Sequence, residues 1–198
     1  MEDILNTAET IQFLPERGSI EPDPIKELEN GLGLWAAVLE KIPNGVIAGG
    51  AIRDFIMGVQ PKDIDVFIPS KLFKASNFEQ WEPHPNAVEY EAGDHVDAVL
   101  QRKLFGWVVD LILVNLPETE ESFGARVIKS FDFGITRSWF DGELHDTLEA
   151  CHDREKGRVT LMLEDRLDRA WKRFDRFNAA HGNSWTFVAP PRPTEEVI

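Results

Sequence analysis

The sequence predicts an α/β fold, in which a small mixed β-sheet carries helices mainly on one face and ends in a C-terminal helix. Two observations predict the sheet: polar and apolar residues alternate strictly over residues 63–68, and residues 107–114 form a mostly apolar run. A third observation predicts the helices, because apolar residues recur at helical spacing over 24–41 and 164–180. With 198 residues, 42% of them hydrophobic, we expect one domain around a single core.

Composition and charge exclude several classes of protein. The single cysteine, Cys151, permits no intramolecular disulfide and no cysteine-based metal site, which favours a reducing, cytoplasmic location. The first residues lack the pattern of a secretory signal, and no apolar run is long enough to cross a bilayer, so we expect no membrane partner. A net charge of −14 argues against broad, sequence-independent nucleic-acid binding, although residues 151–181 are locally basic.

The elements of the first half are separated by glycine and proline. Each helix is predicted from apolar residues at helical spacing, and each strand from alternation or a short apolar run. The expected elements are an irregular arm at 1–23, a helix at 24–41, a strand at 45–48, a turn at Gly49-Gly50, a helix at 51–57, a strand at 63–68 ended by Pro69, and a helix followed by a loop at 71–85.

The second half is predicted by the same signals. The run at 164–180 is the clearest helix, because its apolar residues lie on one face and its arginines on another. The expected elements are strands at 87–90, 96–102 and 107–114, a short helix within 117–140, a strand at 158–163, the helix at 164–180, and a proline-rich, partly disordered tail at 182–198. The domain itself is therefore expected at 24–181.

One group of residues has the parts that a single chemistry needs. Between a strand and a helix, Gly49-Gly50 lets backbone N–H groups approach a phosphate closely. Asp63 and Asp65 project from one face of the next strand, close enough to share hard cations such as magnesium. A third carboxylate is expected from Asp110, because a charge within an apolar strand needs a partner, and Asp97 is its rival.

Two runs carry a resemblance to a known family. The run Gly-Gly-Ala-Ile-Arg-Asp at 49–54 and the run Pro-Lys-Asp-Ile-Asp-Val-Phe at 61–67 resemble the signature of the DNA polymerase β type nucleotidyltransferases. The similarity is greatest to the head domain of CCA-adding tRNA nucleotidyltransferases and bacterial poly(A) polymerases. The resemblance implies the minimal nucleotidyltransferase fold. The roles it implies are catalysis and metal binding for Asp63, Asp65 and Asp110, and triphosphate contact for Gly49, Gly50 and Arg53.

The resemblance also implies a reaction. The enzyme would transfer a nucleoside monophosphate from an NTP such as ATP to a hydroxyl and release pyrophosphate, with two Mg²⁺ ions or Mn²⁺ in their place. The acceptor would be an RNA, such as the 3′ end of tRNA, a protein side chain or a small molecule. The small size is typical of stand-alone enzymes of phages and toxin–antitoxin systems, which would act in the cytoplasm of the host cell.

Two later segments show weaker similarity in the same order. Asp132-Phe133-Gly134-Ile135-Thr136 resembles an Asp-Phe-Thr-Ile-Asn segment of that head domain, and Glu164-Asp165 followed by Arg173-Phe174 resembles its Glu-Asp…Arg-Phe segment. Lys129-Ser130-Phe131 stands where the family usually has paired arginines, so base selection is not transferred. The last helix carries a stripe of arginines, of which Arg169 and Arg173 are assigned to nucleotide binding; the whole stripe is Arg166, Arg169, Arg173 and Arg176.

Other interpretations stay open beside these. The arginine stripe can instead form i,i+4 ion pairs on a solvated helix, and Arg53 can simply pair with Asp54. The chain can be a nucleotide- or partner-binding module on an altered transferase core, or a small-molecule nucleotidyltransferase of the aminoglycoside type. The five histidines show no metal-ligand spacing and are interpreted as structural, and the neighbours Cys151 and His152 do not form a dyad.

Overall fold

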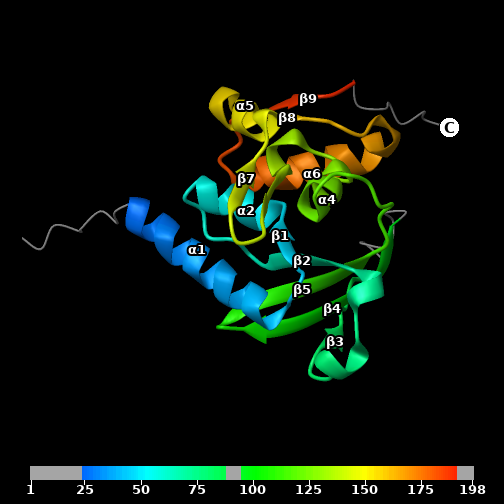
Figure 1. Cartoon of the computed structure of the whole chain (residues 1–198). Helices are drawn as coiled ribbons and strands as arrows, with labels where there is room; N and C mark the ends of the chain where they lie inside the picture. Colours follow the sequence, from blue (N-terminus) through cyan, green and yellow to red (C-terminus); the bar gives the residue numbers. More distant parts are fainter. Residues whose placement is uncertain (1–23, 88–94, 191–198) are drawn as a thin grey trace, which may run out of the picture.

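The computed structural model describes residues 24–87 and 95–190, whose arrangement is shown in Figure 1. Within them, seven strands form one mixed sheet in the order β3-β4-β5-β2-β1-β6-β7, and β8 and β9 form a separate parallel pair. The strands are β1 (Val46–Ala48), β2 (Ile64–Pro69), β3 (Glu82–Pro83), β4 (Val96–Leu104), β5 (Trp107–Val114), β6 (Ser138–Phe140), β7 (Leu144–Asp146), β8 (Arg158–Thr160) and β9 (Thr186–Val188). The helices are α1 (Pro24–Lys41), α2 (Gly50–Ile56), α4 (Phe123–Lys129), α5 (Leu148–Lys156) and α6 (Leu167–Ala180).

The α/β class and the mixed sheet are confirmed. At the centre of the sheet β2 and β5 are parallel, whereas the other neighbours in it are antiparallel. Helices lie over both faces rather than mainly over one, because parallel central strands bury side chains on each side. Val66 and Leu111 face a core shared with α1 and α2, and Phe67 and Ile112 face a second core shared with α4.

The β4–β5 hairpin sets the register of one edge of the central pair. Leu104 pairs with Trp107, so the turn between them has two residues, Phe105 at φ 51° and Gly106 at φ 86°. Positive φ at both turn positions matches the twist of the flanking strands. This register places Gln101 of β4 directly opposite Asp110 of β5.

Helix α6 is held by an aromatic core of its own. Phe174 stacks on Phe187 of β9 with ring centroids 4.7 Å apart, and Trp171 meets the same ring edge-on at 4.7 Å. Figure 1 shows α6, β8 and β9 together on one side of the large sheet. The expected irregular tail is therefore wrong for residues 186–188, which pair with β8, whereas residues 191–198 lie outside the described residues.

The predicted elements agree with the structure where the pattern is long. The predicted bounds of α1 and β5 match the structure, and β2 differs by one residue at each end. The helix predicted within 71–85 is wrong: short 3-10 turns at Ser70–Leu72 and Ala75–Asn77 precede β3 there. The arm at 1–23 and most of the strand predicted at 87–90 lie outside the described residues. In the described part of the chain, no helix combines the length and the apolarity needed to span a bilayer.

Candidate functional site

Two predicted acidic residues meet at the centre of the sheet. Asp65 of β2 is in direct register with Asp110 of β5, so both carboxylates stand on the same face of neighbouring parallel strands. Asp63 directly precedes β2 and lines a cavity together with Asp65. Asp63, Asp65 and Asp110 are called the acidic centre below. The rival Asp97 is exposed near the start of β4, in an irregularity of the pairing with β5, and is not opposite Asp110. Asp65 and Asp110 are thus neighbours across the two strands, and Asp63 lies close enough for its charge to act on Asp65 and to be acted on by Asp110.

The carboxylate of Asp110 is almost completely buried, with 1% of the residue exposed. Gln101 donates a hydrogen bond from Nε2 to Oδ1 of Asp110 over 2.7 Å. On the other side, Nε2 of His84 lies 3.6 Å from Oδ2 of Asp110. Oδ1 of Asp110 is therefore hydrogen-bonded by a side chain of the neighbouring strand, and Oδ2 lies near a side chain of the loop after β3.

The acidic centre makes ionisation of Asp65 unfavourable. Asp65 is partly exposed as a residue, but its Oδ1 is buried and finds no hydrogen-bond partner among the described residues. Burial, together with the nearby charges of Asp63 and Asp110, raises the pKa of Asp65 from 3.8 to about 8. The pKa of Asp63 is also raised, first by burial and then by the charge of Asp110. A buried carboxylate oxygen without a partner, beside two more carboxylates, has the environment that a bound cation would satisfy.

The glycine turn forms a second wall of the site. Gly49 has φ 88°, a conformation that side-chain-bearing residues rarely adopt, and α2 begins directly after it at Gly50. Arg53, one turn later, lines the same cavity as both glycines. Its guanidinium also pairs with Asp54 over 2.6 Å, so the pairing that had been left open as an alternative does occur.

Two arginines of α6 form the wall opposite the sheet. Arg173 pairs with the buried Asp132 over 2.5 Å, and Nε of Arg169 lies 3.9 Å from the same carboxylate. The guanidinium of Arg173 also lies over the ring of Phe133, 5.6 Å from its centroid. The two weakly similar segments of the sequence are therefore joined by a direct ion pair. Arg169 and Arg173 therefore line the same cavities as Asp65 and do not serve only in ion pairs along the exposed face of the helix.

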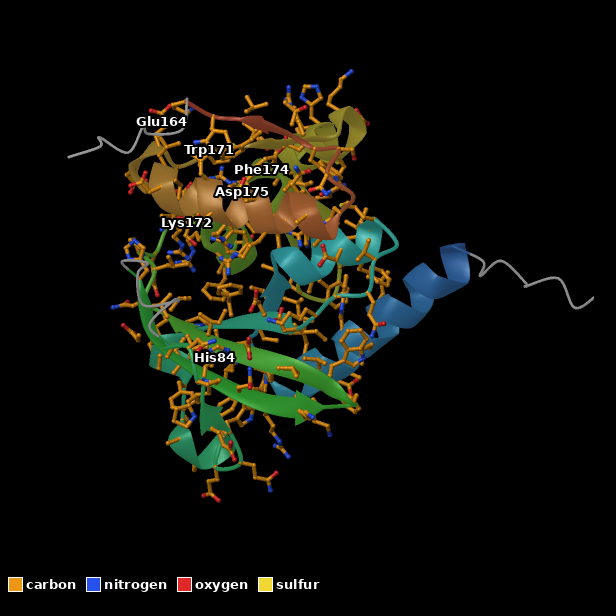
Figure 2. The ribbon with its side chains drawn as sticks, turned by 180° about the vertical axis from the view of Figure 1, so that it is seen from behind. His84, Glu164, Trp171, Lys172, Phe174 and Asp175 are labelled. Carbon is orange, nitrogen blue, oxygen red and sulfur yellow. The ribbon has the colours of Figure 1, made fainter. Side chains whose placement is uncertain are left out.

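Two adjoining cavities lie between the sheet and α6. One, of about 300 Å³, is lined by the glycine turn, Arg53 and Phe131, and the other, of about 640 Å³, by Asp63, His84 and Lys172. Asp65, Arg169 and Arg173 line both cavities. Figure 2 shows Lys172 on α6 and His84 beside the sheet, and both residues line the second cavity. Asp65 thus lies where the two cavities adjoin.

The three carboxylates are the type of ligand that a hard divalent cation prefers, but their oxygens do not surround a single point. Among residues 24–87 and 95–190, no three acidic, histidine or cysteine side chains converge as a ready metal cage. The Oδ1 of Asp65, which has no partner among the described residues, and the raised pKa of Asp63 and of Asp65 are nevertheless features that a neighbouring cation would relieve. Asp63, Asp65 and Asp110 are the residues that could hold Mg²⁺, since carboxylate oxygens are its preferred protein ligands.

Two residues that contact Asp110 were not predicted from the sequence to belong to the site. His84 was interpreted as structural with the other histidines, yet it contacts Asp110 and lines the second cavity. Gln101 could have been found, because a two-residue turn at Phe105-Gly106 counts back to Gln101 opposite Asp110. The side chain of Arg166 lies outside the described residues.

Comparison with solved structures shows a likeness to CCA-adding enzymes. A CCA-adding enzyme in complex with CTP matches with a TM-score of 0.54 and 17% identity, over 77% of this chain and 39% of that one. A CCA-adding enzyme with ATP matches with a TM-score of 0.52 and 16% identity, over 81% and 39%. The CCA-adding enzyme of Thermotoga maritima complexed with tRNA matches with a TM-score of 0.50 and 16% identity, over 77% and 37%.

At these identities the likeness shows the fold alone. The fold is nucleotidyltransferase-like, and the chain spans about two fifths of the length of the enzymes it matches. No protein-family model and no curated protein matches the sequence.

Proposed function

We propose that this chain is a metal-dependent nucleotidyltransferase, which transfers a nucleoside monophosphate from an NTP to an acceptor hydroxyl and releases pyrophosphate. The observation that carries the proposal is the register of Asp65 with Asp110, beneath a cavity whose other walls hold the glycine turn and three arginines. The likeness to enzymes solved with CTP, ATP and tRNA supports the same class of substrates.

The position of each group of residues in the site suggests its role in this reaction. Asp63, Asp65 and Asp110 would hold two Mg²⁺ ions, which when bound would lower the pKa of the attacking hydroxyl and neutralise charge on the leaving pyrophosphate. Burial and the neighbouring carboxylates raise the pKa of Asp65, so its protonated form is favoured, and a bound cation would compete with this proton.

The anionic substrate meets the opposite walls. The backbone around Gly49 approaches the triphosphate closely because no side chain intervenes, and Arg53, Arg169 and Arg173 supply positive charge. Two of these arginines already share Asp132, so their guanidinium groups are oriented before any ligand arrives. Such preorganisation reduces the entropy lost on binding.

The test is transfer of label from each α-labelled NTP, with Mg²⁺ and either total tRNA or a cell extract. We expect the wild type to transfer label and Asp65→Asn and Asp110→Asn to fold but transfer none. Asp97→Asn is the matched control, because it removes an exposed carboxylate of the neighbouring strand and should leave transfer unchanged. Sensitivity of the labelled product to ribonuclease or protease, or to neither, separates RNA, protein and small-molecule acceptors.

A second candidate is a nucleotide-binding module without turnover. The observation that favours it is the engagement of both Asp110 oxygens by groups of the chain itself. Calorimetry separates the two: NTP binding in the presence of Mg²⁺ without label transfer would identify the module. Absence of both binding and transfer would overturn both functions and leave only the fold.

A further inference from the structure

The C-terminal end of α6 and the residue that follows it contact α2 behind Arg53, a residue that lines the first cavity. Asp54 on α2 accepts from Nε of Arg53 at 2.7 Å, and Nε2 of His181 lies 3.3 Å from the same oxygen, Oδ1. The positions of Asp54 and His181 are 127 apart in sequence. This cluster, formed by Arg53, Asp54, Phe177 and His181, is called the helix clamp below.

The ring of Phe177 completes the helix clamp. The guanidinium of Arg53 lies over this ring, 4.7 Å from its centroid, and the imidazole of His181 stacks on the same ring at 4.2 Å. Nδ1 of His181 also lies 2.8 Å from the carbonyl oxygen of Phe177. Both ring nitrogens of His181 are thus engaged, and only 7% of its side chain is exposed. The buried ring of His181 is thus packed against Phe177, with its Nε2 beside the carboxylate of Asp54.

The helix clamp fixes two walls of the cavity relative to each other. Arg53 follows the glycine turn by one helical turn, and its Nη2 folds back to within 3.6 Å of the position that a Cβ on Gly50 would occupy. Helix α6 carries Arg169 and Arg173 on the other side of the same cavity. A triphosphate between these walls needs all three guanidinium groups at a set spacing, because charge-assisted hydrogen bonds weaken steeply with misalignment.

We propose that His181 is a positioning residue of the triphosphate site: by holding Asp54 it holds the guanidinium of Arg53 at the cavity wall that faces Arg169 and Arg173. The inference rests on the proposed function, since it needs a triphosphate in that cavity. His181 does not contact the substrate; it acts through Asp54 and Arg53. Its loss should therefore matter only as long as Arg53 is present.

The test is a double-mutant cycle on ligand binding. His181→Phe keeps an aromatic ring on Phe177 and removes both ring nitrogens. Calorimetry with NTP and with tripolyphosphate, each with Mg²⁺, should show affinity about tenfold weaker for this variant, and similarly weaker for Arg53→Gln. Because His181 acts through Arg53, the double variant should bind no more weakly than Arg53→Gln alone. Additive losses would mean that His181 affects binding independently of Arg53, and either this result or unchanged affinity in His181→Phe would overturn the inference.

The chain offers a matched control. His145 also stacks on an aromatic ring, Trp139 at 4.5 Å, and also contacts a carboxylate, Asp141 at 2.9 Å, but neither it nor its partners line the first cavity. His145→Phe should leave both affinities unchanged. An equal loss in His145→Phe would contradict a specific role for His181.

A measurement on the unaltered protein covers the case in which His181→Phe does not fold. With ¹⁵N-labelled histidine, addition of tripolyphosphate and Mg²⁺ should shift the ring signals of His181 and leave those of His145 in place. Unmoved His181 signals on binding would overturn the positioning role. If the wild type binds neither NTP nor tripolyphosphate, the proposed function fails; if it binds both and His181→Phe binds equally well, only the inference about His181 fails.

Discussion

Replacing Asp65 by asparagine should make the protein more stable while abolishing its activity. Burial and the neighbouring carboxylates raise the pKa of Asp65 from 3.8 to about 8, so at neutral pH the chain must take up a proton there in order to fold. At about 1.4 kcal/mol per pKa unit, this uptake costs on the order of 4 kcal/mol at pH 7. Relaxation of neighbouring side chains reduces the cost, and we expect Asp65→Asn to gain about 2 kcal/mol at pH 7.

The sign of the pH dependence is fixed by the direction of the shift. Because the folded pKa lies above the unfolded one, the stability contributed by Asp65 is full below pH 3.8 and is lost as the pH rises to about 8. Asparagine does not titrate, so the advantage of Asp65→Asn should be small near pH 4, should grow through neutral pH and should level off above pH 8. Urea unfolding of both proteins from pH 4 to 9, in the presence of a chelator, measures this difference.

Added Mg²⁺ provides the complementary half of the experiment. A cation that binds the folded chain at Asp65 displaces the proton and stabilises the wild type, increasingly so above neutral pH, but should have little effect on Asp65→Asn. Asp97→Asn serves as the control, because this exposed carboxylate should change neither profile. The reasoning would be refuted if Asp65→Asn were less stable than the wild type at pH 8, or if their difference were independent of pH.

Three further predictions concern backbone strain, the ion pairs of α6 and the reactivity of the cysteine. Gly49→Ala, at φ 88°, should lose about 1–2 kcal/mol by thermal unfolding, whereas Gly33→Ala on α1, where an added Cβ meets nothing within 4 Å, should gain about 0.5 kcal/mol. Asp132→Asn weakens the ion pairs that hold α6 and should cost about 2 kcal/mol in urea unfolding; an unchanged midpoint would contradict that role. The hydrogen bond to Asp146 raises the pKa of the Cys151 thiol, so Asp146→Asn should speed its alkylation at pH 8, and a slower reaction would count against this cause.

Much of the acidic centre was predictable because each part has a local signal. Strict alternation places Asp63 and Asp65 on one face, and a lone carboxylate in an apolar strand singles out Asp110. What alternation does not supply is the parallel register of Asp65 with Asp110, which depends on how the strands pair across the sheet. His84 escaped for the same reason, since its loop meets Asp110 only in the folded chain.

Several short strands and one helix were not predicted, because their residues show too little periodicity in polarity. β6, β7 and β9 have three residues each, too few for a period-2 signal to stand out, and prolines beside β9 suggested a tail. Helix α5 has little apolar periodicity, but its ends were marked in the sequence. Thr147 caps its first turn by accepting from the amide of Ala150, and Gly157 ends it at φ 59°.

The contacts of α6 with Asp132, and of His181 just after α6 with Asp54, have a consequence for the order in which the molecule is made. On the ribosome, every strand of the large sheet is synthesised before α6, so the aspartates of β2 and β5 can come together while Arg169 and Arg173 are still missing. If the chain binds a triphosphate as proposed, its site would be complete only late in synthesis, when contacts that span up to 127 positions have formed.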